Sequence, residues 1–362
     1  MSEMRFEVVA SGPTGRAGVL SLPHGDVPTP AFMPVATRGT VKAVDTEDLR
    51  ELGADIVLGN AYHLWRAPGV EALEAAGGLH AFMGWSRPIL TDSGGFQAVS
   101  LARAGTARVE EAGVRFDDGG LLTPEAAVEL QQRMGADIAM ALDQPLDFPA
   151  GVDAQLEATA RTHRWAERCR AAWDPRQGAL FGIVQGGFDA ALRRESAAAI
   201  RALDFPGYGI GGLSMKEPPE VMAPLLEAAV AGLEPHKPRY LMGVGSGPEL
   251  VASVASGVDL FDCVWPTRLA RTGTVLVAGG RYNLLNTRFA EDAAPLEEGC
   301  DCPACRRHSR AGARYMFQRG ELLGLRLLTL HNLHHLLALL RGLRATIMAG
   351  AAAGVGGDAP GL

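Results

Sequence analysis

The stretch 258–271, VDLFDCVWPTRLAR, contains the residues of this chain most suited to covalent chemistry. A short apolar run brings the carboxylate of Asp262 to the expected end of a strand, and Pro266, Arg268 and Arg271 follow directly. A carboxylate beside guanidinium groups keeps a low pKa and stays ionised, which suits a nucleophile better than a proton donor. Taken alone, the segment equally allows a structural ion pair between Asp262 and Arg268.

Other polar residues and glycines follow short apolar runs in the same way. They are Asp92, Asp143, Gln185, Gly211, Gly212 and Gly243. A single carboxylate after a strand is usually a helix cap, but six coordinated positions favour one shared site at the ends of the strands. The glycines of Ser93-Gly94-Gly95 and of 211–212 can let backbone N–H groups approach a planar ligand, and the glycine-rich run 243–247 before a helix could hold a phosphate.

Three cysteines form a tight cluster. Cys300, Cys302 and Cys305 supply soft ligands at a spacing suited to tetrahedral zinc. In a chain that we interpret as cytosolic, such a cluster is more typical of a metal site than of a disulfide framework. The spacing leaves the fourth ligand open among four histidines, namely His308, His331, His334 and His335. Nothing in the pattern indicates an open catalytic position, so the predicted zinc is structural.

The elements that must position these groups are short apolar runs that alternate with helical stretches. Runs that are apolar throughout are typical of parallel strands covered by helices. Eight such units predict an α/β fold with a (β/α)8 TIM barrel, and a doubly wound open sheet is the alternative. The eight runs are 32–36, 55–58, 88–90, 137–142, 180–184, 208–210, 240–244 and 258–261.

Length and composition define the organisation. The 362 residues are 47% apolar and 21% charged. We predict a barrel with an N-terminal hairpin over 1–290, a zinc-binding subdomain with a closing helix over 291–349, and a disordered tail over 350–362. No run reaches the ~18 apolar residues of a membrane helix, and the start lacks a secretory signal, so we expect a cytoplasmic protein with no membrane partner.

The charge pattern is uneven. Lys plus Arg number 34 against 41 for Asp plus Glu, a net charge of −7, which excludes a uniformly basic coat. The segment 300–345, however, holds eight arginines against Asp301 and Glu321. Such a locally basic face can bind a phosphate backbone whatever the total charge.

Longer motifs resemble the bacterial tRNA-guanine transglycosylase family, also called queuine tRNA-ribosyltransferases. The resemblance covers nearly the whole chain. The matching stretches are GNAYHLWRAPG (59–69), GGLHAFMGWSRPILTDSGGFQAVSL (77–101), LFGIVQGG (180–187), GYGIGGL (207–213), YLMGVG (240–245), DLFDCVWPTR (259–268) and CDCPAC with TLHN (300–332).

The resemblance implies roles for individual residues. Asp262 matches the family's nucleophile, Asp92 its general acid/base, and Phe96 an aromatic that stacks on the base. The other residues matching its base-binding positions are Ser93, Gly94, Gly95, Asp143, Gln185, Gly211, Gly212, Leu213 and Met242. Those matching RNA contacts are Gly243, Val244, Gly245, Ser246, Gly247, Pro248, Glu249, Thr267, Arg268, Leu269, Ala270 and Arg271. Cys300, Cys302, Cys305 and His331 match the ligands of one structural zinc ion per subunit.

The implied reaction exchanges guanine at the wobble position of tRNAs with GUN anticodons for a 7-deazaguanine, in queuosine biosynthesis. A carboxylate beside C1′ stabilises the oxocarbenium-like state and captures it covalently, while a second carboxylate handles the N9 proton. The resemblance also implies a homodimer. The alternatives are a non-catalytic RNA-binding paralogue, against which the presence of both Asp92 and Asp262 speaks, and a transglycosylase or nucleosidase with another base or nucleic acid.

The sequence departs from the family pattern around the position of the 7-substituent. Gln144-Pro145 replace Glu-Cys, Ser214-Met215-Lys216-Glu217 replace the usual Ala/Ser-Val-Gly-Glu, and the loop 116–121 is short. Because Met215 is bulkier than the usual residue, the pattern favours the small base 7-aminomethyl-7-deazaguanine over queuine.

Overall fold

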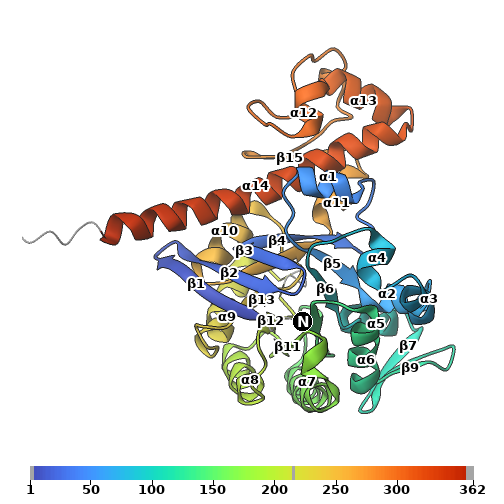
Figure 1. The fold of residues 1–362 in the computed structure, drawn as a ribbon, viewed down its shortest axis with the longest axis vertical. Coiled ribbons are helices and arrows are strands. Elements are labelled where there is room, and N and C mark those ends of the chain that lie inside the picture. The colour runs from blue at the N-terminus through green and yellow to red at the C-terminus, as the bar shows by residue number, and fades with distance from the viewer. Residues whose placement is uncertain (1–3, 214–216, 356–362) are drawn as a thin grey trace, which may run out of the picture.

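The computed structural model describes residues 4–213 and 217–355. Its centre is a closed barrel of eight parallel strands in the order β10-β11-β12-β13-β14-β4-β5-β6, with β6 pairing back onto β10 (Figure 1). The predicted (β/α)8 barrel is therefore confirmed, and the open sheet is excluded because the two ends of the sheet join. Closure matters for function because it brings the carboxyl ends of all eight strands to one face.

Each predicted apolar run overlaps one barrel strand, with ends that differ by up to three residues. The strands are β4 (Ala31–Ala36), β5 (Val57–Asn60), β6 (Ile89–Asp92), β10 (Ile138–Met140), β11 (Ala179–Val184), β12 (Tyr208–Ile210), β13 (Arg239–Leu241) and β14 (Leu260–Cys263). The run 240–244 is shorter than predicted, since Gly243 has a φ of +79°, which turns the chain away from the strand direction. Asp92 and Asp262 lie within the last two residues of their strands rather than after them.

Helices cover the outside of the barrel. Those after the strands include α1 (Thr46–Glu51), α2 (Ala61–Arg66), α5 (Gly95–Arg103), α6 (Pro124–Met134), α7 (Val152–Ala172), α8 (Ala190–Ala202), α9 (Pro219–Ala231), α10 (Gly247–Ala255) and α11 (Trp265–Ala270). Local sequence explains their ends. In α6 the Thr123 side chain accepts from the Ala126 amide, Pro124 occupies the first turn, and Gly135 ends the helix in the left-handed conformation.

The N-terminal segment forms more than the predicted hairpin. Strands β1 (Arg5–Gly12) and β2 (Gly15–Leu22) make the hairpin, and β3 (Gly25–Thr29) adds a third antiparallel strand. Side chains of this sheet such as Leu20 and Val27 join the apolar cluster of the barrel interior, so the sheet closes one end of the barrel. A second small sheet, β7 (Ala107–Glu110), β8 (Gly113–Phe116) and β9 (Leu121–Leu122), is inserted between α5 and α6.

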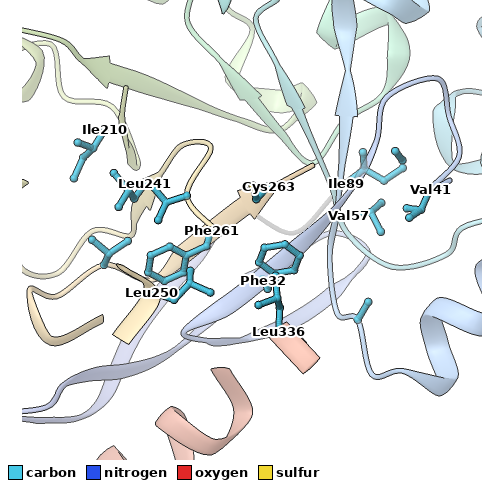
Figure 2. Packing of buried hydrophobic residues seen from close by; sticks show 14 of the residues in the cluster. Phe32, Val41, Val57, Ile89, Ile210, Leu241, Leu250, Phe261, Cys263 and Leu336 are labelled. Carbon is cyan, nitrogen blue, oxygen red and sulfur yellow. The ribbon is translucent and has the colours of Figure 1, made fainter. Parts of the chain in front are cut away.

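The C-terminal segment packs across the barrel. It comprises the hairpin β15 (Thr274–Val277) and β16 (Gly280–Asn283), the helices α12 (Pro303–Arg307) and α13 (Arg310–Gln318), and the long helix α14 (Leu322–Val355) (Figure 1). Figure 2 shows Leu336 of α14 beside Phe32 of β4, with Phe261 of β14 and Leu250 of α10 nearby. Helix α14 thus covers the seam where the first and last strands of the barrel pair.

Two predicted boundaries lie in the C-terminal part of the chain. Helix α14 continues to Val355, so the predicted tail begins too early, and 356–362 lie outside the described residues. The division at 290 stays a prediction, although the hairpin β15–β16 hydrogen-bonds to residues beyond it: the Leu276 amide donates to Asn332 Oδ1 at 2.9 Å. Among the described helices, none combines the length and apolar character required to cross a bilayer.

Candidate active site

A cavity of about 930 Å³ lies at the carboxyl ends of the barrel strands. Its wall includes Asp92 from β6, Asp143 after β10 and Asp262 from β14. Carboxylates that are far apart in the sequence therefore face one space, as their positions at strand ends predict. The size is near the upper end of the roughly 300–1,000 Å³ range of small-molecule sites. The cavity can therefore accommodate more than a single base.

Asp262 is held by neutral donors rather than by arginine. The Tyr240 hydroxyl donates to Asp262 Oδ1 at 2.6 Å, and the Gly243 amide donates to the same oxygen at 2.7 Å. Among the described residues, neither Arg268 nor any other cation forms an ion pair with it. Burial is the main cause of its pKa shift and raises the pKa of Asp262, while the two donors lower it. The prediction of a low pKa set by arginine is thus wrong, and so is the alternative of a structural ion pair.

Asp92 accepts hydrogen bonds from side chains and backbone around it. Asn60 Nδ2 donates to Oδ2 at 2.6 Å, the Ala61 amide to Oδ1 at 3.0 Å, and Gln97 Nε2 to Oδ2 at 3.2 Å. Asn60 is positioned because β5 and β6 pair with Asn60 opposite Asp92. Burial, helped by the negative charge of Asp262 and opposed by the hydrogen-bond donors, raises the pKa of Asp92 to about 7. A carboxyl group that titrates near neutral pH can both donate and accept a proton.

Asp143, which lines the cavity, forms a buried pair with Gln185, which does not line it. Gln185 Nε2 donates to Asp143 Oδ2 at 2.6 Å, and Ser93 Oγ lies 3.5 Å from Oδ1. Burial raises the pKa of Asp143 to about 6. A Cβ atom added at Gly211 would lie 2.6 Å from Gln185 Nε2, and one at Gly95 would lie 2.6 Å from Asp143 Oδ1. These two glycines therefore make room for the polar pair.

The remaining predicted base-binding residues differ in exposure. Phe96 is 50% exposed and lines the cavity, so a face of its ring is open to a planar ligand. Leu213, Met242 and Gly212 line the same cavity. Gly94 and Gly212 have φ values of +81° and +67°, a conformation that other residues rarely adopt.

The predicted RNA-contacting residues lie partly at the rim. Those that line the cavity are Gly243, Gly245, Ser246, Glu249, Thr267, Arg268 and Arg271, whereas Gly247, Pro248 and Leu269 do not. Val244 and Ala270 are fully buried, so neither residue offers accessible surface to a ligand. The Ser246 hydroxyl donates to Glu249 Oε2 at 2.6 Å in the first turn of α10. A carboxylate therefore lies where the glycine-rich run predicted a phosphate.

Some cavity residues were not identified from the sequence. Asn60 could have been found, because it is the polar residue that ends β5. Tyr240 lies inside an apolar run and resembles a core residue. Lys42 lies outside any motif analysed, and His63 lies in the motif 59–69 but was given no role there; both line the cavity. The residues at which the sequence departs from the family pattern differ in position. Pro145 lines the cavity, whereas Gln144 Oε1 accepts a hydrogen bond from Arg161 Nη1 at 2.7 Å. Met215 lies outside the described residues.

The cysteine–histidine cluster (Cys300, Cys302, Cys305 and His331) comes together beside α14. His331 Nδ1 lies 3.7, 3.6 and 3.3 Å from the three sulfur atoms in that order. Ligands at tetrahedral angles, with metal distances of roughly 2.3 Å to sulfur and 2.1 Å to nitrogen, would be separated by roughly 3.6 Å. The four side chains could therefore hold a metal ion.

The imidazole of His331 is also oriented for metal binding. It is fully buried, and its Nε2 lies 2.7 Å from the Leu276 carbonyl oxygen. Donation from Nε2 leaves the lone pair of Nδ1 directed at the three thiols. The other candidate histidines on this helix are engaged elsewhere, since His334 pairs with Asp301 and His335 with Glu297.

Comparison with known proteins agrees with this architecture. A family model described as queuine tRNA-ribosyltransferase matches residues 11–355. Similar proteins include the queuine tRNA-ribosyltransferases of Symbiobacterium thermophilum (49% identical, covering 96% of this chain and 88% of the relative) and of Geobacillus kaustophilus (48%, covering 95% and 92%). That of Listeria innocua is 47% identical and covers 96% and 93%. A match of this length and identity establishes that the chain belongs to the queuine tRNA-ribosyltransferase family.

Proposed function

We propose that this enzyme replaces guanine at the wobble position of tRNAs with GUN anticodons by a 7-deazaguanine, in queuosine biosynthesis, through a covalent aspartyl-ribosyl RNA intermediate. The observation that carries the proposal is the pair Asp92 and Asp262, two carboxylates in different hydrogen-bond environments that line one cavity. Family membership supports the same reaction.

The first displacement assigns one oxygen of Asp262 to the attack. Oδ1 accepts both hydrogen bonds, from Tyr240 and from Gly243, so Oδ2 is the oxygen that faces the ribose. Its electron pair forms a bond to C1′ while the bond from C1′ to N9 of guanine breaks. The protonated form of Asp92 supplies the proton that the departing N9 takes up, and a pKa of about 7 keeps that form populated at neutral pH.

The second displacement reverses the roles. Asp92, now ionised, accepts the N9 proton of the incoming 7-deazaguanine, whose N9 attacks C1′ and releases Asp262 as a carboxylate. Two inversions at C1′ retain the β-configuration, as in double-displacement glycosidases. The donors from Asn60 and Gln97 hold Asp92 in place in both protonation states.

Base selection is assigned to the buried pair Asp143 and Gln185, with Phe96 stacking on the ring and Leu213 and Met242 packing beside it. The target base must leave the stack of the anticodon loop to reach this pair. Adenine would leave a buried acceptor unpaired, at a cost of about 1–3 kcal/mol per group. The proposed incoming base is 7-aminomethyl-7-deazaguanine.

We assign one structural zinc ion to the cysteine–histidine cluster. Three thiolates and one imidazole would supply all four ligands of a tetrahedral zinc ion and leave no position for substrate. The chain residues around it hold β15 against α14, because His331 and Asn332 both hydrogen-bond to Leu276. A homodimer and a cytoplasmic location complete the proposal and rest on the family resemblance.

The test is trapping of the covalent RNA adduct with denaturant. We expect Asp262→Asn to abolish the adduct, and the exposed-carboxylate control Asp118→Asn to form as much as the unmodified enzyme. An undiminished adduct in Asp262→Asn would contradict the proposed nucleophile. Guanine exchange by the purified chain would exclude a non-catalytic paralogue. Incorporation of labelled guanine into tRNA but not into DNA would exclude a DNA substrate.

The incoming base is tested by competition. Guanine, 7-aminomethyl-7-deazaguanine and queuine are offered together to the enzyme with tRNA. We expect 7-aminomethyl-7-deazaguanine to be incorporated in preference to queuine, and preferential incorporation of queuine would overturn that assignment while leaving the exchange reaction intact.

A further inference from the structure

Trp265 differs from the other tryptophans of the chain in its exposure. Trp265 is 36% exposed, whereas Trp65 is partly buried and Trp85, Trp165 and Trp173 are buried. It also lines the cavity that contains Asp262, which lies only three residues before it. A large aromatic face left open at the mouth of a functional cavity is typical of a binding surface.

The indole is held on a fixed backbone. The Trp265 amide donates to Cys263 Sγ at 3.3 Å, and Asn332 Nδ2 of α14 donates to the Pro266 carbonyl oxygen at 3.1 Å. The guanidinium of Arg281 lies over the Trp265 ring, 5.7 Å from its centroid. Because the Trp265 indole is already held in place, stacking of a ligand on it costs little conformational entropy.

The surroundings of the ring are basic. Arg268 and Arg271 line the same part of the cavity, and Arg281 covers the indole. In the part of the chain that the structure describes, none of these three arginines forms an ion pair with a carboxylate. An aromatic face beside uncompensated cations is the combination by which proteins bind single-stranded nucleic acid, since bases stack on the ring and the cations attract the phosphates.

We propose that Trp265 stacks on the unpaired nucleotide next to the one whose base is exchanged. The inference rests on the proposed function, in which one nucleotide of a single-stranded loop is turned into the cavity. Turning it out removes a stacking partner from its neighbour. Trp265, at the rim beside the nucleophile, replaces that partner, and Arg281 on the indole adds positive charge near the backbone. Trp265 is thus a positioning residue for the RNA rather than for the free base.

The experiment measures guanine exchange with a tRNA anticodon stem-loop for Trp265→Ala and Trp265→Phe. Stacking on an aromatic residue contributes about 1–3 kcal/mol, which corresponds to a rise of about 5- to 150-fold in the KM for RNA in the alanine variant. We expect Trp265→Phe to stay close to the unmodified enzyme, and the KM for free base to be unchanged in both. Leu156→Ala, which removes a 50% exposed apolar side chain on α7, is the control.

Two further measurements identify the stacking partner. Addition of RNA should quench tryptophan fluorescence, and Trp265→Phe should lose that quench. Two further stem-loops lack the base on the 5′ side or on the 3′ side of the exchanged nucleotide. With one of these two RNAs, Trp265→Ala and the unmodified enzyme should have the same KM for RNA.

The inference is overturned if Trp265→Ala leaves the KM for RNA unchanged, if the quench persists in Trp265→Phe, or if both abasic RNAs keep the full penalty. Failure of the proposed function gives a different result, because the unmodified enzyme would then exchange no guanine in tRNA. Equal melting temperatures of the variants exclude misfolding as the cause of a raised KM.

Discussion

Replacing Asp92 by Asn should change the stability of the protein in a pH-dependent way. In the unfolded chain a carboxyl group titrates near its ordinary pKa of 3.8, whereas burial raises the pKa of Asp92 in the folded protein to about 7. Between these values the folded state keeps a proton that the unfolded state has lost. The stabilising contribution of protonated Asp92 is therefore complete below about pH 4 and is lost as the pH rises through about 7.

The magnitude follows from the two pKa values. With 3.8 and about 7, ionisation lowers the free energy of unfolding by about 1.7 kcal/mol at pH 5 and about 4 kcal/mol at pH 8.5. Asparagine does not ionise, so the Asp92→Asn variant does not lose this free energy. Its free energy of unfolding relative to that of the unmodified enzyme should therefore rise by about 2–3 kcal/mol from pH 5 to pH 8.5. The donors Asn60 and Gln97 favour the ionised form of Asp92, and their effect is already contained in its folded pKa.

The assay is urea denaturation of both proteins at about pH 5 and pH 8.5. The control is Asp174→Asn, because a hydrogen bond from Arg176 holds the pKa of that carboxyl group well below its usual range, outside the interval tested. We expect a pH-independent effect for the control. A difference between Asp92→Asn and the unmodified enzyme that is the same at both pH values would refute the elevated pKa, and with it the argument that Asp92 exchanges protons near neutral pH.

Three further predictions concern the carboxylate donors, the glycines and the metal. Tyr240→Phe removes a hydrogen bond to the carboxylate of Asp262, a loss of about 1.5–3 kcal/mol, so kcat should fall about 10- to 150-fold. The pKa of Asp262 rises further when a donor is lost, so the acidic limb of the pH–rate profile should move to higher pH, and an unmoved limb would contradict this. Gly95→Ala places a Cβ atom 2.6 Å from Asp143 Oδ1 and should raise the KM for guanine at least about 10-fold, whereas Gly151→Ala, whose Cβ meets nothing within 4 Å, should not. Removal of metal with a chelator should release one zinc ion per chain and lower the melting temperature, as atomic emission and calorimetry would show; an unchanged melting temperature would exclude a structural metal.

The barrel could be predicted because its signal is local. Strands such as β11, buried at every position, leave a continuous apolar run in the sequence, and the helix caps at Asp45 and Thr123 are short-range patterns. The third N-terminal strand, β3, was missed for the complementary reason. It holds Gly25, Asp26 and Pro28, residues that disfavour strands, and it forms through pairing with β2.

The electrostatics of the site could not be predicted from neighbours in the sequence. Arg268 follows Asp262 closely along the chain, which suggested an ion pair, but α11 turns and leaves that arginine exposed. The groups that do contact the carboxylate, Tyr240 and Gly243, come from the adjacent strand β13 and the turn after it. Burial raises the pKa of Asp262 and these two donors oppose the rise, so the pKa shift is set by tertiary surroundings and not by Arg268.

The choice of the fourth metal ligand is a similar case. Three histidines within five residues are equivalent by spacing from Cys305. They differ in direction around α14, and the packing of that helix on β15 buries His331 against the Leu276 carbonyl. Only His331 is thereby directed at the three sulfur atoms.

The sequence by itself determined the order of strands and helices, the family, and which residue types stand at the strand ends, because these depend on local patterns and on long matching motifs. Tertiary structure alone decided which atoms surround each carboxylate, how far each one is from water and which histidine meets the sulfur atoms. Hydrogen-bond partners and burial are set by segments distant along the chain, and free energies of ionisation depend on those surroundings rather than on sequence neighbours.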